Sequence, residues 1–492
     1  MNGTENKPPE TGEELTIRGS CQLRKEVVTV NELIFTRKVT DVISTDVLVI
    51  GGGPAGVAAA IASARNGAKT MLVERCGFVG GMATAALVGP FMTCYDGKGE
   101  KQIIRGIYDE LVNKLEDIGG AIHPSKIGWG TPHAAFIRIG HDHVTPFDSE
   151  LLKLVAEEML VESGVRLLYY TQFIDCEVES GRIASVIVAK KDGLSAINAK
   201  VYIDCSGDAD VAEKANVPVV KGRIKDGAMQ PATMFFKVCN VDSEKVYEEI
   251  NKNRDLMDDF FAGAFCWAIA EGKKNGEWTI TRDELGTYET HNKGEWRLNT
   301  TRMLHVDGTK SEDLTRASIE GRKQVQQVYR FLRKRIPGFE NVKMLETGSV
   351  VGIRETRHIV GKYVMEKEDI LNANNFEDNI LLCSNAIDIH SDSDGGGEYK
   401  VIDSWYGIPY RSLLPNNCDN LLVAGRTISA TSEAASAFRV MPCCFGIGQA
   451  AGTAAALCLK ENVNPEDVSI EELQKTLISQ DVFLNKWEHH KI

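Results

Sequence analysis

The sequence lacks paired cysteines, long apolar runs and an excess of basic residues, and each absence excludes a class of protein. Its 12 cysteines include no C-x-x-C pair, which argues against an iron–sulfur cluster, a zinc knuckle and a disulfide-reductase dithiol. No apolar run reaches the length of a membrane span, and the first fifteen residues are polar, without the apolar core of a signal peptide. We therefore expect reduced thiols, a cytoplasmic location and no membrane partner.

The charge balance is negative and the chain is long. The 56 Lys and Arg residues are outnumbered by 69 Asp and Glu residues, which gives a formal net charge of −13. Such a surface repels phosphate backbones, so no nucleic-acid partner is expected. A chain of 492 residues exceeds one usual hydrophobic core, so we expect two or more lobes.

The most informative pattern that is present begins with the apolar run 47–50, which is typical of a parallel strand buried on both faces. Three glycines follow at the spacing of a dinucleotide-binding turn. Gly51 permits the tight turn, Gly53 lets the backbone approach a pyrophosphate, and Gly56 lets a helix pack closely on the strand.

The residues after this turn complete the pattern. The alanine-rich stretch from Ala55 to about Asn66 predicts a helix whose N-terminus faces phosphates. Residues 69–74 predict a second strand that ends in Glu74, where a carboxylate accepts hydrogen bonds from a ribose. The order of strand, glycine turn, helix, strand and acid therefore predicts a site for an adenine dinucleotide.

Periodicity and turn residues outline the rest of the chain. Helices are expected at Gln102–Ile118, Asp148–Glu162, Glu312–Arg335 and from Gly446 to about Leu459. Strands are expected at Val27–Val30, Leu33–Phe35, Leu167–Tyr170, Phe173–Val178, Arg182–Val188, 200–204, Asn379–Cys383 and 420–424. Because strands of the nucleotide-binding type return late in the chain, we expect a discontinuous domain with an inserted lobe.

Four segments resemble a known family: Gly51–Gly56 with Glu74; Gly80-Gly81-Met82-Ala83-Thr84; Ile203–Asp208; and Leu421–Arg426 with Arg439–Ala450. The chain is similar to the FAD-dependent oxidoreductases with two dinucleotide-binding domains, the group shared with fumarate reductase flavoproteins, and more narrowly to FAD-dependent oxidoreductases labelled xanthan-lyase-like. The third segment has Ser206 where the family usually has Thr, which keeps the hydroxyl.

The resemblance implies an α/β fold with a Rossmann-like, discontinuous FAD-binding domain of the glutathione-reductase type and an inserted α+β substrate domain. The expected parts are an N-terminal extension (1–43), the FAD-binding domain (44–90, 150–219 and 376–465), the substrate or cap domain (91–149 and 220–375) and a C-terminal tail (466–492). A homo-oligomer is an expectation that rests on the resemblance to this family alone.

The resemblance also implies FAD contacts. The residues expected to bind the cofactor are Gly51, Gly53, Pro54, Ala55, Gly56, Glu74, Arg75, Gly80, Gly81, Met82, Ala83, Thr84, Phe173, Ser206, Gly207, Asp208, Gly425, Arg426, Arg439, Gly446, Gly448 and Gln449. A helix that starts near Gly446 to Gln449 would direct its N–H groups at the flavin, where reduction adds negative charge. The alternative is a small-residue helix that packs tightly on the sheet.

Candidate catalytic residues are polar side chains near these segments: His390, Tyr410, Arg354, Arg357 and His141. His390 could transfer the proton that accompanies a hydride, or it could be a surface-loop residue. Arg354 and Arg357 could bind a substrate carboxylate or pair with Glu355. Arg411 and Arg439 could likewise contact the substrate or serve structure. His141 and His143 could contact substrate or, less readily, a metal. Cys443 and Cys444 fit packing better than thiol chemistry.

These observations predict an enzyme: a flavoprotein that transfers a hydride between FAD and a small polar substrate, either a carboxylate or a polyhydroxyl compound. One alternative is a flavin-binding electron-transfer or maturation partner of another protein, which would show no turnover of its own. A second, an RNA-modifying flavoprotein, is disfavoured by the negative charge.

Overall fold

A five-stranded parallel sheet positions the glycine turn. In a computed structural model of the chain, which describes residues 38–258, 263–391 and 397–484, its strand order is β19-β8-β2-β3-β4. These strands are β2 (Val47–Ile50), β3 (Thr70–Val73), β4 (Arg166–Leu168), β8 (Val201–Asp204) and β19 (Leu421–Val423). Every residue of β2, β3, β8 and β19 is buried, as the unbroken apolar run at 47–50 predicted.

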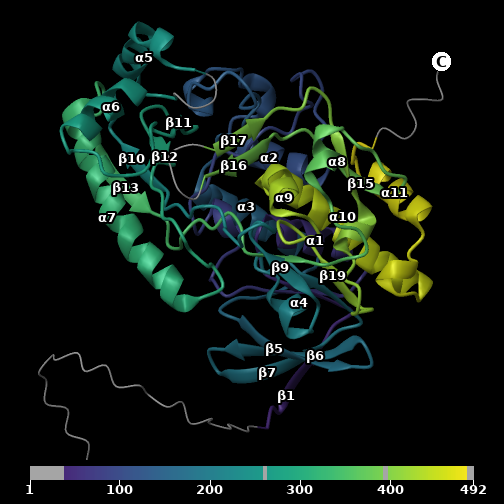
Figure 1. Ribbon diagram of the computed structural model, residues 1–492. Coiled ribbons are helices and arrows are strands. Elements are labelled where there is room, and N and C mark those ends of the chain that lie inside the picture. The colour runs from purple at the N-terminus through teal and green to yellow at the C-terminus, as the bar shows by residue number, and fades with distance from the viewer. Residues whose placement is uncertain (1–37, 259–262, 392–396, 485–492) are drawn as a thin grey trace, which may run out of the picture. The chain divides into compact units, whose positions relative to one another are not determined.

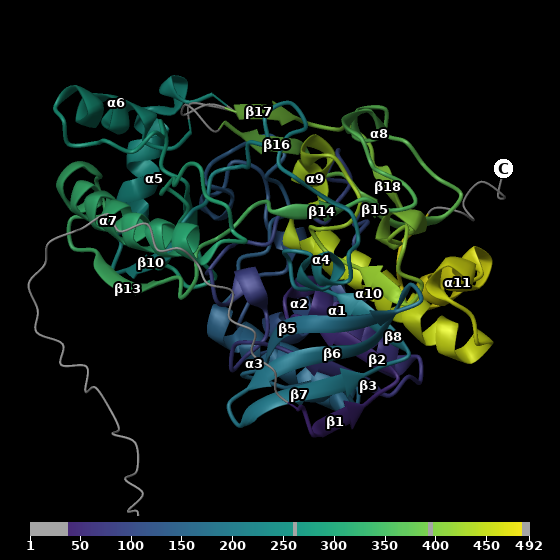
Figure 2. The same ribbon diagram turned by 60° about the horizontal axis from the view of Figure 1, so that its bottom comes forward.

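Two helices lie against each other beside this sheet. Helix α1 (Pro54–Arg65) connects β2 to β3, and helix α10 (Met441–Glu461) packs along it (Figure 2). The close approach depends on glycine, because a Cβ on Gly448 would lie 2.1 Å from the carbonyl oxygen of Ala55. Of the helices in the described residues, α10 alone is long and apolar enough to cross a membrane, and 94% of its most apolar window is buried inside the protein.

A second sheet, in the order β1-β7-β6-β5, adjoins the five-stranded parallel sheet, which we call the nucleotide-type sheet. Its strands are β1 (Asp41–Ser44), β5 (Gln172–Glu179), β6 (Arg182–Lys190) and β7 (Gly193–Asn198). The predicted hairpin at 173–188 is thus β5 and β6, which pair antiparallel. Their apolar side chains share a core with β2 and β8 through Val186, Leu48 and Tyr202.

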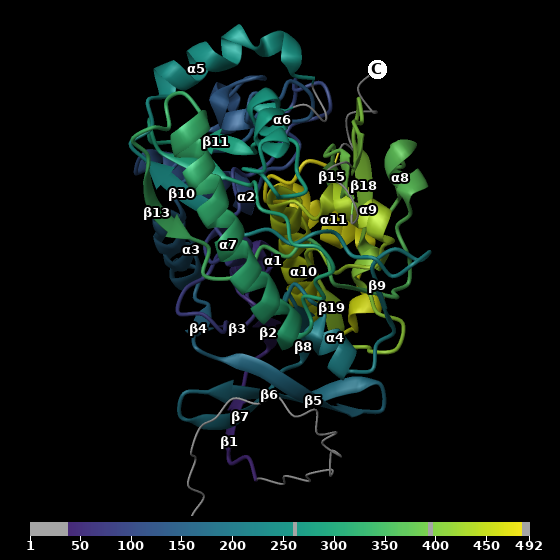
Figure 3. The same ribbon diagram turned by 60° about the vertical axis from the view of Figure 1, so that its left-hand side comes forward.

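A separate hydrophobic core belongs to residues from the middle of the chain. It contains the antiparallel sheet β11-β12-β10-β13, which is covered by helices α5, α6 and α7 (Figures 1 and 3). These elements are β10 (Phe236–Cys239), β11 (Thr287–Glu289), β12 (Trp296–Leu298), β13 (Lys343–Thr347), α5 (Ser243–Lys252), α6 (Cys266–Lys274) and α7 (Ser311–Arg335). Fully buried Trp296 and Phe339 lie in this core, which we name the cap.

Three two-stranded ribbons complete the fold: β14 with β9, β15 with β18 and β16 with β17. Their apolar residues pack in the cores of the nucleotide-type half and not in the cap. Their bounds are β9 (Val219–Lys221), β14 (Arg357–Ile359), β15 (Asn379–Cys383), β16 (Ile387–His390), β17 (Gly397–Lys400) and β18 (Tyr406–Pro409). The strand expected at 379–383 is β15, which pairs antiparallel with β18 and not with the five-stranded sheet.

The remaining helices are α2 (Ile107–Asp117), α3 (Ser149–Glu162), α4 (Asp210–Lys214), α8 (Lys367–Leu371), α9 (Ser432–Phe438) and α11 (Ile470–Ser479). Helices α2 and α3 pack in the same core as α1. Most of the segment 91–149 therefore shares the core of the nucleotide-type half, whereas Phe136 packs in the cap. The strands expected at 27–30 and 33–35 lie outside the described residues, as does the end of the tail from residue 485.

Candidate functional site

The glycine turn leaves open space in front of helix α1. Gly51 has a φ of +100°, and a Cβ there would lie 2.4 Å from the carbonyl oxygen of Cys205. A Cβ on Gly56 would lie 1.8 Å from the oxygen of Gly51. A Cβ on Gly53 would meet no atom within 4 Å, and no side chain caps α1 at this N-cap position. The turn is thus closed on the protein side and open on the side where the first N–H groups of α1 emerge.

Glu74 follows β3 and holds the turn. Its Oε2 accepts a hydrogen bond from the backbone N–H of Gly52 at 2.7 Å, and its Oε1 accepts one from Cys76 at 2.8 Å. A carboxylate has further lone pairs, so these bonds leave acceptor capacity toward a ribose.

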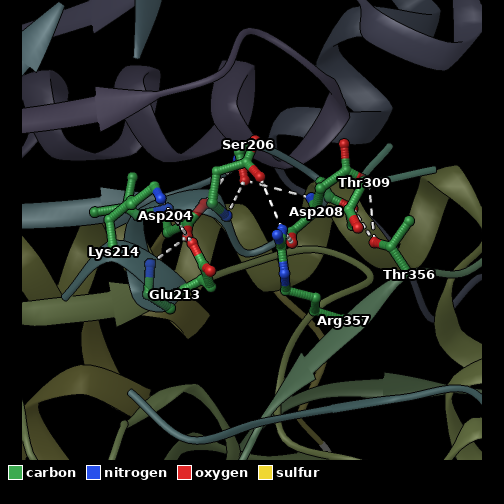
Figure 4. A network of polar contacts seen from close by, with 12 residues as sticks. Asp204, Ser206, Asp208, Glu213, Lys214, Thr309, Thr356 and Arg357 are labelled. Carbon is green, nitrogen blue, oxygen red and sulfur yellow. Dashed lines mark hydrogen bonds and ion pairs between the residues drawn. The ribbon is translucent and has the colours of Figure 1, made fainter. Parts of the chain in front are cut away.

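A polar network surrounds the end of β8 (Figure 4). Buried Asp204 accepts hydrogen bonds from the backbone N–H groups of Ser206, Val211 and Ala212, each at 3.0 Å. Asp208 pairs with Arg426 at 2.8 Å. The segment 204–208 is thereby fixed beside the glycine turn, which β2 and β8 bring together as parallel neighbours.

One cavity of about 330 Å³ joins these segments to the cap. Its lining includes the following predicted site residues: Gly51, Gly53, Pro54, Ala55, Glu74, Arg75, Gly81, Met82, His141, Ser206, Gly207, Asp208, Arg354, His390, Gly425, Arg426 and Arg439. Segments separated by several hundred residues in sequence therefore face one space.

Other predicted site residues do not line this cavity: Gly56, Gly80, Ala83, Thr84, Phe173, Arg357, Tyr410, Gly446, Gly448 and Gln449. Some of them support the lining. The Gly80 N–H donates to the oxygen of Gly52 at 2.8 Å, and Arg357 donates to the oxygen of Asp208 at 2.9 Å. Phe173 lies in β5 and packs against the core beneath the two sheets.

The start of the last small-residue helix differs from the expectation. Helix α10 begins at Met441, so Gly446, Gly448 and Gln449 lie inside it and not at its N-terminus. A Cβ on Gly446 would lie 2.5 Å from Leu381, and Gln449 accepts a hydrogen bond from the Ile107 N–H. These three residues serve packing, and the first turn of α10 faces the cavity instead, through Met441 and Cys444.

Tyr410 and Arg411 also lie elsewhere. The Tyr410 side chain is fully buried, and its hydroxyl donates to the carbonyl oxygen of Pro465 at 2.8 Å. The Arg411 guanidinium stacks over Tyr363 at 4.7 Å. Neither residue lines the cavity, so neither belongs to the catalytic group proposed below.

The cavity contains an acid–histidine pair. His390 Nε2 lies 3.5 Å from Asp388 Oδ2, and Arg439 donates to the same oxygen at 3.1 Å. Burial raises the pKa of Asp388, but its interactions with His390, Arg439 and Arg354 outweigh this and hold that pKa well below its usual range. Burial lowers the pKa of His390 to about 4, against the opposing charge of Asp388. At neutral pH the pair is therefore a carboxylate beside a neutral imidazole.

The three histidines of the loop before α3 have different surroundings. His141 lines the cavity between Tyr288 and Tyr399, with both ring centroids at 6.4 Å, and its buried Nδ1 has no hydrogen-bond partner. His143 contacts two backbone carbonyl oxygens, each at 3.0 Å, and so anchors the loop. His133 contacts the oxygen of Glu289. No group of three or more potential metal ligands occurs within the described residues.

The cap contributes residues that the sequence did not reveal: Arg282, Glu284 and Tyr288. Arg282 donates to Glu284 at 2.8 Å. They belong to no motif, and only the fold brings them opposite Asp388 and His390. Arg282 and Glu284 lie in the loop before β11 and Tyr288 lies in β11, and no pattern in the sequence distinguishes these three residues from other polar residues.

Residues 46–477 match the sequence profile of the FAD dependent oxidoreductase family, and the chain belongs to this family. It is an enzyme of the oxidoreductase class, and its cofactor is FAD. The cavity fits this cofactor, because it combines an open glycine turn, an uncapped helix N-terminus and a carboxylate at the ribose position.

Two curated relatives match parts of the chain. A 3-hydroxybenzoate 6-hydroxylase from Klebsiella oxytoca is 21% identical over 281 residues, which are 54% of this chain and 61% of the hydroxylase. A digeranylgeranylglycerophospholipid reductase from Methanocaldococcus jannaschii is 40% identical over 62 residues, or 13% of this chain and 16% of the reductase. The chain thus matches less than two thirds of either relative's length.

Solved structures with a similar chain path are more distant in sequence. A p-nitrophenol 4-monooxygenase from Pseudomonas putida is 11% identical, with 90% of each chain covered and a TM-score of 0.46. A geranylgeranyl bacteriochlorophyll reductase-like protein from Thermoplasma acidophilum is 14% identical, with 90% of this chain and 85% of the other covered and a TM-score of 0.43.

Proposed function

We propose that the protein transfers a hydride between FAD and a small polar substrate, a carboxylate or a polyhydroxyl compound, that enters the cavity between the glycine turn and the cap. When bound, FAD supplies the two-electron redox chemistry. The observation that carries the proposal is the Asp388–His390 pair, because it lies in the same cavity as the cofactor cradle.

The roles of the residues follow from their contacts. If Nε2 of His390 carries its proton toward Asp388, Nδ1 is left free to accept a proton from a substrate hydroxyl. Asp388, held by Arg439, then stabilises the imidazolium that forms. His141, with its unpartnered Nδ1, contacts the substrate. The neutral state of His390 at pH 7 favours the oxidative direction.

We also infer the finer features of the fold and setting. The order of the parallel strands and the late return of β19 support a discontinuous FAD-binding domain of the glutathione-reductase type. The negative net charge supports a cytoplasmic enzyme that acts on small molecules and not on nucleic acid.

The test is anaerobic reduction of the bound flavin. Polar metabolites are added to the FAD-loaded protein without oxygen, and bleaching of the flavin absorbance band is followed in a stopped-flow spectrometer. We expect a hydroxylated substrate to bleach the band, and His390→Gln to slow this step by about 10²- to 10⁴-fold while FAD content is kept.

The matched control is His305→Gln, since His305 is exposed and lies outside the cavity lining; it should reduce at the wild-type rate. Unchanged reduction in His390→Gln would remove His390 from the mechanism. Bleaching by a reduced nicotinamide alone, with none by any metabolite, would contradict the oxidative direction and point to a reductase or an oxygenating enzyme.

A further inference from the structure

Among the described residues, two arginines of the cavity lining form no ion pair, exposed Arg75 and partly buried Arg354. Arg439 pairs with Asp388 and Arg282 with Glu284, at 3.1 and 2.8 Å. Arg354 instead donates only to neutral acceptors, the carbonyl oxygen of Pro231 at 2.6 Å and the side-chain oxygen of Asn299 at 3.5 Å. A guanidinium has five N–H donors, so Arg354 retains several for a ligand.

The surroundings of Arg354 make this positive charge costly. It lines the cavity and is partly buried. Burial and the positive charges of Arg439 and Arg282 lower its pKa to about 9, against the charge of Asp388, and Arg302 adds to the lowering. The nearby charge of Asp388 offsets only part of this cost, and a cation with little solvent and no ion pair destabilises a protein unless an anion joins it. An anionic ligand would supply the missing partner.

Arg354 also lies near the group that we assign to proton transfer. Its positive charge contributes to the low pKa of His390 and to that of Asp388. Arg354 and His390 also line the same cavity, so both face the space that a ligand would occupy. A substrate that engages both would carry its negative charge only a few bonds from the hydroxyl that loses its proton.

We propose that the substrate is a hydroxycarboxylate whose carboxylate binds Arg354 and whose hydroxyl meets His390. This rests on the proposed function and decides between the carboxylate and polyhydroxyl classes. The carbinol C–H bond breaks and its hydrogen leaves with both electrons to FAD, while the hydroxyl proton passes to His390. The product is the corresponding oxocarboxylate, and FAD is reduced by two electrons.

The experiment compares two ligands that differ in charge and little in shape, glycolate and glycolamide. Each is titrated into the FAD-loaded protein at pH 7, and binding is read from ligand-observed NMR relaxation and from changes in the visible flavin spectrum. We expect glycolate to bind about 10-fold or more tightly than glycolamide, since only the carboxylate forms charge-assisted hydrogen bonds with the Arg354 guanidinium. Equal binding of the two, or binding of neither, overturns the inference.

Variants then assign the preference to one side chain. Arg354→Gln should remove the preference for glycolate, and Arg354→Lys should keep part of it because the charge remains. The control is Arg316→Gln, on the exposed face of α7, which should bind both ligands as the wild type does. If Arg354→Gln still prefers glycolate, Arg354 is not the carboxylate site. If this variant no longer binds FAD, the comparison of glycolate with glycolamide in the wild-type protein decides whether the cavity binds a carboxylate.

These results are separable from the proposed function. Glycolate binding requires no turnover, whereas hydride transfer is judged by anaerobic bleaching and by His390→Gln. A protein that is bleached by a neutral polyhydroxyl substrate and ignores glycolate would keep the first proposal and refute this one.

Discussion

Gly53 allows the cofactor cradle to be tested apart from the fold. A methyl group at this position enters the cavity, because no atom lies within 4 Å of an added Cβ, and the φ of −72° suits alanine. Exchanging an N-cap glycine for alanine costs about 1 kcal/mol of capping preference, and the stiffer unfolded chain offsets about 0.4–1 kcal/mol. The stability of the apoprotein in Gly53→Ala should therefore stay within about 0.5 kcal/mol of the wild type.

FAD binding should respond differently to Gly53→Ala. The methyl group occupies the space in front of the α1 N-terminus and keeps a phosphate from its N–H groups. Loss of such charge-assisted hydrogen bonds costs about 1.5–3 kcal/mol, so the dissociation constant of FAD should rise about 10- to 100-fold. Denaturant unfolding of the apoprotein and quenching of FAD fluorescence on titration measure the two effects separately.

The control for this pair of measurements is Gly128→Ala. A Cβ on Gly128 also meets no atom within 4 Å, and this glycine lies outside the cavity lining. It should leave both stability and FAD affinity unchanged. Wild-type FAD affinity in Gly53→Ala would refute the placement of the phosphates against the glycine turn.

Three further predictions concern packing, capping and pH. In Gly448→Ala the new Cβ would lie 2.1 Å from the Ala55 oxygen. Overpacking should destabilise the apoprotein by about 1–3 kcal/mol, and the higher helix propensity of alanine should offset about 1 kcal/mol of this. A urea midpoint equal to that of the wild type would show that α1 and α10 separate freely. Asp204→Asn places an amide NH₂ against backbone donors and should cost about 1–3 kcal/mol in thermal unfolding, whereas an unchanged melting temperature would contradict the network of Figure 4. The pKa of His390 is lowered to about 4, so this proton acceptor stays neutral above pH 5. The rate of flavin reduction should therefore be constant from pH 8 to pH 5 and fall only near pH 4. A fall in rate near the ordinary histidine pKa of about 6.5 would contradict the buried setting of His390.

The local features of the nucleotide-type half could be predicted because their causes are local. An unbroken apolar run is what a strand buried on both faces requires, and β2 has those bounds. The position of Gly51 follows from its φ of +100°, which only glycine adopts freely. The predicted helix over 148–162 is also local in origin, since Asp148 caps α3 by accepting two backbone N–H groups.

The start of α10 was mispredicted although a signal was present. Pro442 occupies one of the first two positions of the helix, where proline is favoured because its missing N–H has no partner there. Because of the glycines at 446 and 448, the start of this helix was predicted too late in the chain. Their function depends on the helix they face, and sequence spacing alone does not reveal that neighbour.

The substrate side of the cavity depends on tertiary structure. Arg282 and Tyr288 come from the cap, and their approach to Asp388 is set by how the cap packs and by no local pattern. The apolar run at 379–383 predicts a strand but not its neighbour, and only the structure shows that it pairs antiparallel with 406–409.

The late position of β19 and α10 in the chain has a consequence for synthesis. A ribosome completes β2, α1 and β3 within the first 73 residues, but the helix that covers α1 is made only from residue 441 onward. Until then the apolar side of α1 lacks its partner and the cavity lacks the wall formed by Gly425, Arg426 and Met441. Cofactor loading must therefore be among the last events of biogenesis, and a nascent chain stalled before this point would be a natural client for chaperones.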